Sequence, residues 1–127
     1  MNYLIVEDSP AMRRVIMRAI SILGDHNTLE ANDGVEAIDI LNNYDIDFVI
    51  TDWLMPNMDG IELVNKIRNG KSKPNIPILM ITTKSTKDDL IHAFQNKVDD
   101  YVVKPINTEI IHKKIKSIMD KKKAMSV

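Results

Sequence analysis

Residues 48–52 read Phe48-Val49-Ile50-Thr51-Asp52, a short apolar run that ends on a carboxylate. Short apolar runs that alternate with helical patterns are typical of buried parallel strands. In an open parallel sheet, ligands bind outside the carboxyl ends of the strands. Three other runs also lead into polar residues capable of chemistry: Leu4-Ile5-Val6 before Glu7-Asp8, Pro77-Ile78-Leu79-Met80-Ile81 before Thr82, and Tyr101-Val102-Val103 before Lys104-Pro105. We therefore expect acids, a hydroxyl and an ammonium to converge on one edge of one sheet.

The composition of the chain excludes several classes of protein. Its 127 residues fit one domain spanning residues 1–127. The 17 basic and 18 acidic residues give a net charge of −1, without the basic bias of nucleic-acid binders. The chain has no cysteine, which excludes disulfides and thiolate metal sites. No apolar stretch approaches the roughly 20 residues that a membrane span needs. The first residues are already strand-like and leave no room for a signal peptide, so we expect a cytoplasmic protein without nucleic-acid partners.

The spacing of apolar residues predicts five strand-then-helix units. The strands are expected at 2–6, 28–31 (an edge), 47–51, 77–81 and 101–103, and the helices after Ser9, Asp33, Asp59, about 86 and about 107. Such an alternation predicts an α/β three-layer sandwich. Spacing alone leaves the order of the strands open between Rossmann-like and flavodoxin-like arrangements.

Turn and cap residues predict where the helices begin. Ser9 is expected to cap the first helix, with Pro10 in its first position. Asp33 and Asp59 are each followed three residues later by Glu, which predicts two capping boxes. Residues 68–75 hold a Gly and a Pro and are expected to form a surface loop. We expect Asn96 to take a left-handed position after the fourth helix.

Basic side chains lie off the packed faces of two helices. On the first helix, Arg13, Arg14 and Arg18 lie off the apolar face and are predicted to be solvated. On the last helix, apolar residues at 111, 115 and 118 form the packed face. The other face and tail carry lysines, which suit the carboxyl end of the helix dipole: Lys113, Lys114, Lys116 and Lys121 to Lys123.

The polar strand ends predict a metal-assisted phosphoryl site. If the first and third strands are neighbours, Glu7, Asp8 and Asp52 share one pocket, where like charges destabilise one another unless a cation joins them. Oxygen-only ligands favour Mg²⁺. The Asp52 carboxylate is ionised at neutral pH and can attack a phosphoryl group without a general base. Lys104 would neutralise the phosphoryl oxygens and Thr82 would donate a hydrogen bond to them.

Three rival classes fail against the same residues. A flavodoxin needs a glycine- and hydroxyl-rich phosphate loop after its first strand, whereas this chain has Glu7-Asp8-Ser9-Pro10. A haloacid-dehalogenase-type phosphatase needs a nucleophile at the end of the first strand and an Asp two residues later, whereas residue 10 of this chain is Pro. Dinucleotide binding needs Gly-x-Gly-x-x-Gly, which is absent.

Over essentially its whole length the chain resembles the receiver domain of two-component response regulators, and most closely the single-domain chemotaxis members. The most specific stretches are residues 6–9, the run Asp52-Trp53-Leu54-Met55-Pro56-Asn57-Met58-Asp59-Gly60, and residues 101–105. The resemblance implies a parallel sheet in the flavodoxin-like order 2-1-3-4-5. It also implies a phosphoacceptor that assists its own phosphotransfer and slow dephosphorylation, rather than an enzyme.

The resemblance also implies a role for each site residue. Asp52 matches the phosphoacceptor. Glu7 and Asp8 match the acidic pair that binds Mg²⁺ with Asp52, and the backbone carbonyl of Leu54 matches a further ligand. Lys104 matches the lysine that pairs with the phosphoryl group. Thr82 and Tyr101 match a switch pair in which the hydroxyl moves to the phosphate and the aromatic ring swings inward.

The implied partners are a sensor histidine kinase, a downstream target such as the flagellar motor switch, and a phosphatase. The target would bind the face formed by the fourth helix, the fifth strand and the fifth helix. Leu54, Thr83 and Lys84 depart from the chemotaxis pattern, which leaves the lifetime of the phosphoryl group open. Two alternatives to a stand-alone switch remain: a phosphorelay intermediate that passes phosphate to a histidine phosphotransferase, and a constitutive interaction module or fragment of a longer regulator.

Overall fold

The computed structural model describes residues 1–24 and 26–125, and this part of the chain alternates five strands with five helices. In chain order they are β1 (Asn2–Val6), α1 (Pro10–Ile22), β2 (Asn27–Ala31), α2 (Gly34–Asn43), β3 (Phe48–Asp52), α3 (Gly60–Arg68), β4 (Ile78–Thr82), α4 (Lys87–Gln95), β5 (Asp100–Val103) and α5 (Thr108–Met125). None of the helices described is long and apolar enough to cross a membrane. The predicted strand-helix alternation is confirmed.

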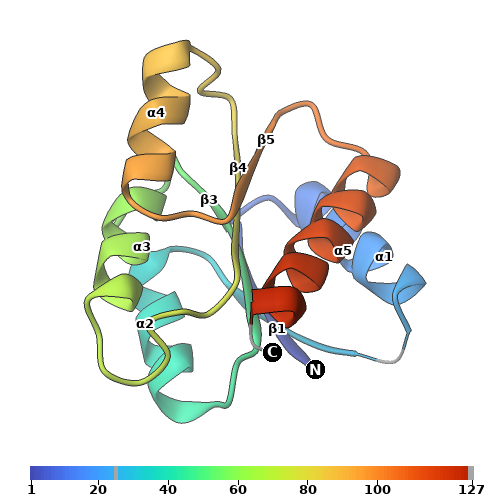
Figure 1. Ribbon diagram of the computed structural model, residues 1–127, viewed down its shortest axis with the longest axis horizontal. Helices are drawn as coiled ribbons and strands as arrows, with labels where there is room; N and C mark the ends of the chain where they lie inside the picture. Colours follow the sequence, from blue (N-terminus) through green and yellow to red (C-terminus); the bar gives the residue numbers. More distant parts are fainter. Residues whose placement is uncertain (25, 126–127) are drawn as a thin grey trace.

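All neighbouring strands of the sheet are parallel, in the order β2-β1-β3-β4-β5. The three-layer sandwich with flavodoxin-like strand order is therefore confirmed, with β2 at one edge as predicted. Helices α1 and α5 cover one face of the sheet, and α2, α3 and α4 cover the other (Figure 1). This order makes β1 and β3 neighbours, so it brings together the polar residues that follow them.

Two apolar clusters hold the three layers together. Alternate residues of a strand face opposite sides of a sheet. Accordingly, Leu4 and Val6 pack in the cluster under α2, α3 and α4, while Tyr3 and Ile5 pack in the cluster under α1 and α5. The central strand β3 and its neighbour β4 are buried along their full length. The helices thus clamp the sheet from both sides and leave only its ends open to polar chemistry.

The helix caps are mostly as predicted. Ser9 caps α1 by accepting a hydrogen bond from the backbone N–H of Met12, and Pro10 opens the helix. Asp33 and Asp59 accept from the N–H groups three residues on. Both predicted capping boxes lack their second bond in the described residues. At α2 the Glu36 carboxylate accepts from the backbone of Asn32 rather than from that of Asp33, and at α3 the Glu62 carboxylate accepts no hydrogen bond from the backbone of Asp59.

Near α4, the structure forms a box that the sequence interpretation missed and corrects a predicted turn. Thr86 and Asp89 make a full reciprocal capping box at its start. After α4, Lys97 takes the left-handed conformation with φ 70°, whereas Asn96 has φ −86°. Asn96 stays close to helical because its side-chain amide donates to the carbonyl of His92.

The predicted surface loop is confirmed from residue 69 on, but its predicted first residue belongs to the preceding helix. Arg68 ends α3 and its side chain is only 8% exposed, because it donates to the carbonyls that close the following loop. Lys114 and Lys122 pair with Asp100 and Asp99 at the start of β5. The packed face of α5 is confirmed, since its three predicted isoleucines are buried.

Candidate functional site

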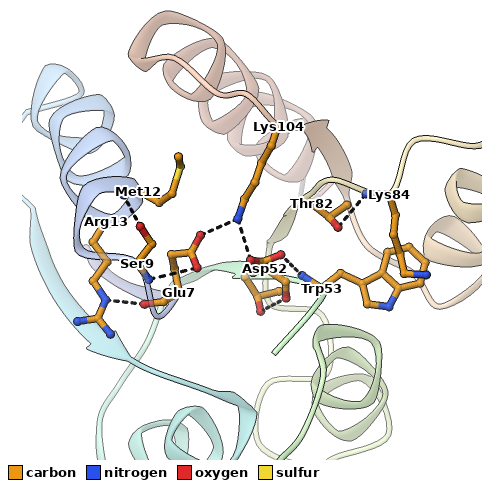
Figure 2. Close-up of polar contacts among 10 residues, drawn as sticks. Glu7, Ser9, Met12, Arg13, Asp52, Trp53, Thr82, Lys84 and Lys104 are labelled. Carbon is orange, nitrogen blue, oxygen red and sulfur yellow. Dashed lines mark hydrogen bonds and ion pairs between the residues drawn. The ribbon is translucent and has the colours of Figure 1, made fainter. Parts of the chain in front are cut away.

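Three of the predicted charged residues meet at the carboxyl edge of the sheet (Figure 2). Glu7 follows β1, Asp52 ends β3, and Lys104 follows β5, just before a cis peptide bond to Pro105. The Lys104 ammonium lies 2.9 Å from Glu7 Oε1 and 2.8 Å from Asp52 Oδ2. One cation therefore bridges two carboxylates that come from different strands.

Burial makes this cluster electrostatically strained. Glu7 is 3% exposed and Asp52 is 8% exposed. Burial raises the pKa of Glu7, and the nearby Asp52 charge raises it further, while the ion pair with Lys104 opposes both effects. Two buried acids thus compete for one counter-charge.

The lysine of the cluster is held in its charged form. Burial alone would lower the pKa of Lys104, but its hydrogen bonds and charge interactions with Asp52 and Glu7 outweigh that effect and raise the pKa. At neutral pH, Lys104 is therefore an ammonium aimed at the end of β3.

Asp52 is fixed on its other side by the backbone. Its Oδ1 accepts a 2.7 Å hydrogen bond from the N–H of Trp53, and the carbonyl of Trp53 accepts from Gly60 at the start of α3. A Cβ at Gly60 would lie 2.2 Å from the carbonyl oxygen of Asp52, so only glycine allows this approach. The N-terminus of α3 is thereby locked against the strand end that carries Asp52.

The donor chemistry of the site fits a divalent cation. Glu7, Asp52 and the exposed Asp8 carry three negative charges against the single positive charge of Lys104, which leaves a local excess of two. Carboxylate oxygens are ligands that Mg²⁺ accepts. In residues 1–24 and 26–125, no three acidic, His or Cys side chains are arranged to hold an ion. The Lys104 ammonium lies between the carboxylates of Glu7 and Asp52 and pairs with both.

Leu54, the remaining predicted ligand, lies in the loop that follows β3, and its side chain is 55% exposed. Its predicted contribution comes from the backbone, so the exposed side chain costs the site no ligand. The loop also contains Asn57, which takes a left-handed conformation with φ 66° and donates a hydrogen bond to Asp33. The segment after β3 is thereby joined to the start of α2.

The predicted switch residues meet through the backbone of one residue. Thr82 ends β4, one position beyond Ile81, which is the register partner of Asp52. The hydroxyl of Thr82 accepts a 3.2 Å hydrogen bond from the N–H of Lys84, and the Tyr101 hydroxyl donates to the carbonyl of Lys84. Burial, followed by the charge of Asp89, raises the pKa of Tyr101 to about 12. The Tyr101 ring, only 6% exposed, is already inside in this structure.

An aromatic cluster beside the site was not predicted. Trp53 is 5% exposed, stacks on His92 at 5.7 Å, and meets Tyr101 edge-on at 6.5 Å. The ammonium of Lys84 lies 4.8 Å from the centroid of the Trp53 ring, within the range of a cation–π interaction. Residue spacing gave no signal for this cluster, because its members come from four separate segments.

Arg13 was predicted to be solvated, and this is wrong. Its side chain is 17% exposed and its Nε donates to the backbone carbonyl of Glu7 (Figure 2). The sequence did hold a signal for this contact: side chains on a helix point back over the preceding turn, and Arg13 lies one turn after the cap Ser9. Arg14 and Arg18 are exposed, as predicted.

Comparison with known proteins defines the class. Residues 3–116 match the model of the response regulator receiver domain. The chain belongs to this family, whose members act in two-component signalling. It is 42% identical over 120 residues to a chemotaxis protein CheY homolog of Campylobacter jejuni, with 94% of this chain and 92% of the relative covered. It is 40% identical over 121 residues to chemotaxis protein CheY of Pseudomonas aeruginosa, with 95% and 98% covered.

Solved structures agree with this assignment. The chain superimposes on chemotaxis response regulator CheY4 of Vibrio cholerae with a TM-score of 0.84 at 28% identity, covering 92% of this chain and 97% of that one. The predicted family and fold are therefore confirmed. As a receiver, the chain is a signalling protein that implies a histidine kinase and a downstream target as partners.

Proposed function

We propose that this chain is a phosphorylation switch in which Asp52 accepts a phosphoryl group from a sensor histidine kinase. The observation that carries the proposal is the bridging of Asp52 and Glu7 by Lys104 at the carboxyl edge of the sheet. A nucleophilic carboxylate, a cation for phosphoryl oxygens and surplus acidic ligands meet there, in a chain of the receiver family. Residues 1–127 act together as one receiver domain.

In this mechanism, the Asp52 carboxylate attacks the phosphorus of a phosphohistidine. The P–N bond breaks, a P–O bond to Asp52 forms, and the departing imidazole takes a proton from water. Lys104 leaves its ion pair with Asp52 and binds a phosphoryl oxygen instead. When bound, Mg²⁺ would be held by Glu7, Asp8, Asp52 and the Leu54 carbonyl, and it would neutralise charge on the phosphoryl oxygens.

Phosphorylation of Asp52 also changes the hydrogen bonds of the switch pair, Thr82 and Tyr101. For its hydroxyl to donate to the new phosphoryl group, Thr82 changes its hydrogen bonding with the backbone of Lys84. The Tyr101 hydroxyl donates to the carbonyl of the same residue, so a shift of the Lys84 backbone also changes the hydrogen bond of Tyr101. Phosphorylation then acts as a local electrostatic event that biases a two-state element.

The proposed output surface lies on α4, β5 and α5. The large apolar side chains exposed there include Ile91, Phe94, Val103 and Ile110. Exposed apolar side chains that lie on adjoining elements mark an interaction surface. We take the target to be a protein of the flagellar motor switch, because curated relatives carry the name of a chemotaxis protein.

The experiment is intact-protein mass spectrometry after incubation with Mg²⁺ and a small acyl-phosphate donor. We expect one phosphoryl increment that requires Mg²⁺ and is lost in Asp52→Asn. Asp120→Asn, which changes an exposed carboxylate on α5, is the matched control and should behave as wild type. No increment in the wild-type chain would contradict the proposal. If the phosphoryl group then left for a histidine phosphotransferase faster than for water, the chain would be a relay intermediate instead.

A further inference from the structure

The Arg13 side chain ties two loops of the site together. Its Nε donates to the carbonyl of Glu7, its Nη2 donates to Oδ1 of Asn32, and its Nη1 lies 3.7 Å from Oε2 of Glu30. Asn32 is itself held by Glu36, which accepts from both its backbone and its side-chain amide. Arg13 thus joins the turn after β1 to the turn after β2.

The position of Arg13 is not explained by the stability of its own helix. A positive charge near a helix N-terminus opposes the helix dipole. Helix α1 already has an N-cap and an N-terminal proline in Ser9 and Pro10. Arg14, the next residue, is exposed, and its side chain has no hydrogen-bond or ion-pair partner in the part of the chain that the structure describes. The contacts of Arg13 therefore serve the loops rather than the helix.

Glu7 is held at both ends of its backbone. Its N–H donates a 3.0 Å hydrogen bond to Ala31 of β2, and its carbonyl accepts from Arg13. Asp8 follows directly, with an exposed side chain, and Ser9 then caps α1. The orientation of the peptide between Glu7 and Asp8 sets the directions of two carboxylates, and Arg13 holds the oxygen of that peptide.

We propose that Arg13 is a positioning residue that holds the Glu7–Asp8 turn in the geometry needed for a divalent cation and for phosphorylation of Asp52. This inference rests on the proposed function and deepens it. Groups that orient the ligands of a metal site change its affinity typically 10- to 100-fold when removed. We expect the lower end of that range, because Glu7 keeps its hydrogen bond to β2.

A positioning role and a purely electrostatic role of Arg13 predict opposite effects on the affinity for Mg²⁺. Arg13 brings a positive charge close to a site that would bind a cation, so removing that charge alone should tighten Mg²⁺ binding. Removing an orienting contact should weaken it. Lysine keeps the charge but lacks the planar fork that reaches a carbonyl and an amide together. Arg13→Met and Arg13→Lys therefore separate the two roles.

The test compares Arg13→Met, Arg13→Lys and the control Arg14→Met with wild type. The fluorescence of Trp53, the only tryptophan, reports Mg²⁺ binding beside Asp52. Hydrogen exchange of the Asp8 and Ser9 amides in metal-free protein reports the order of the turn, and thermal unfolding confirms that each variant is folded. We expect about 10-fold weaker Mg²⁺ binding and faster exchange at these amides in both Arg13 variants.

Two outcomes overturn the inference. Tighter Mg²⁺ binding in Arg13→Met with wild-type behaviour in Arg13→Lys would make Arg13 a charge rather than a positioning group. Equal affinities and exchange rates in the Arg13 and Arg14 variants would make it dispensable, while phosphorylation of the wild-type chain would still stand. If the wild-type chain neither binds Mg²⁺ nor accepts phosphate, the proposed function falls and this inference falls with it.

Discussion

The two ends of the sheet each carry a partly buried ion cluster, and the clusters differ in balance. At the amino end, Arg68 and Lys122 share Asp99, so positive charge is in excess. At the carboxyl end, Glu7 and Asp52 share Lys104, so negative charge is in excess. The difference shows how one kind of interaction serves structure at one end of a fold and chemistry at the other.

The two clusters also differ in how fully their charged groups are hydrogen-bonded. Arg68 donates to the carbonyls of Pro74, Ile76 and Lys97 as well as to Asp99. These carbonyls belong to the segments that enter β4 and β5, and neutral acceptors of this kind stabilise a cation without competing for a metal. Glu7 and Asp52 keep acceptor capacity facing the open edge of the sheet. A saturated cluster resists change, whereas an unsaturated one can accept a ligand.

The largest expected effect is on the amino-end cluster. Arg68→Ala should lower the free energy of unfolding by about 3 kcal/mol, because it removes one of the two cations paired with Asp99 and a donor from three backbone carbonyls. Urea unfolding of the metal-free protein measures this loss. Arg18→Ala, which removes an exposed arginine from α1, is the matched control and should change stability by less than about 0.5 kcal/mol. A loss no larger than that of the control would show that Arg68 is not structural.

The second prediction concerns Mg²⁺, which should act only on the carboxyl-end cluster. At a concentration 100 times its dissociation constant, a ligand of the native state stabilises it by about 2.7 kcal/mol. We expect that gain in the wild-type chain and in Arg68→Ala, and a smaller one in Asp52→Asn. Urea unfolding with and without Mg²⁺ measures all three. An equal gain in Asp52→Asn would place the ion elsewhere.

The same substitution in the two clusters should change stability in opposite directions. Asp99→Asn removes a charge that two cations need and should cost about 2 kcal/mol. Asp52→Asn removes one of two like charges and should stabilise the metal-free protein by about 1 kcal/mol. Urea unfolding in metal-free buffer at pH 7 compares them. A loss of stability in Asp52→Asn would show that its ion pair with Lys104 outweighs the repulsion from Glu7.

The carboxyl-end cluster was largely predictable from the sequence, and the reason is geometric. Buried parallel strands need apolar residues, so the runs before Glu7, Asp52, Thr82 and Lys104 mark strand ends by composition alone. A parallel sheet brings those ends to one edge whatever the strand order. The order itself was not predictable from spacing, and the family resemblance supplied it.

The amino-end cluster and Arg13 were not predicted, because long side chains choose partners that only the folded chain brings together. Arg68 was expected in a surface loop, yet its acceptors are backbone carbonyls of segments up to 29 residues away. Arg13 was expected in solvent, yet it binds the turns after two strands. Composition does not show which carbonyls a fold leaves without a partner, so basic residues near turns are the weak point of such predictions.

The smallest expected effect is on the pH dependence of stability in metal-free protein. The native pKa of Glu7 lies above its ordinary value of 4.5, through burial and the charge of Asp52, so the folded chain holds this proton more tightly than the unfolded chain. The stability from Glu7 is therefore complete below pH 4.5 and is lost as pH rises through the native pKa. Lys104 acts only at higher pH, because its pKa is raised from 10.5. Urea unfolding of wild type and Glu7→Gln over a pH series that begins below 4.5 isolates the effect. The wild type should lose stability relative to Glu7→Gln as pH rises, and a constant difference between the two proteins would mean that Glu7 is not strained.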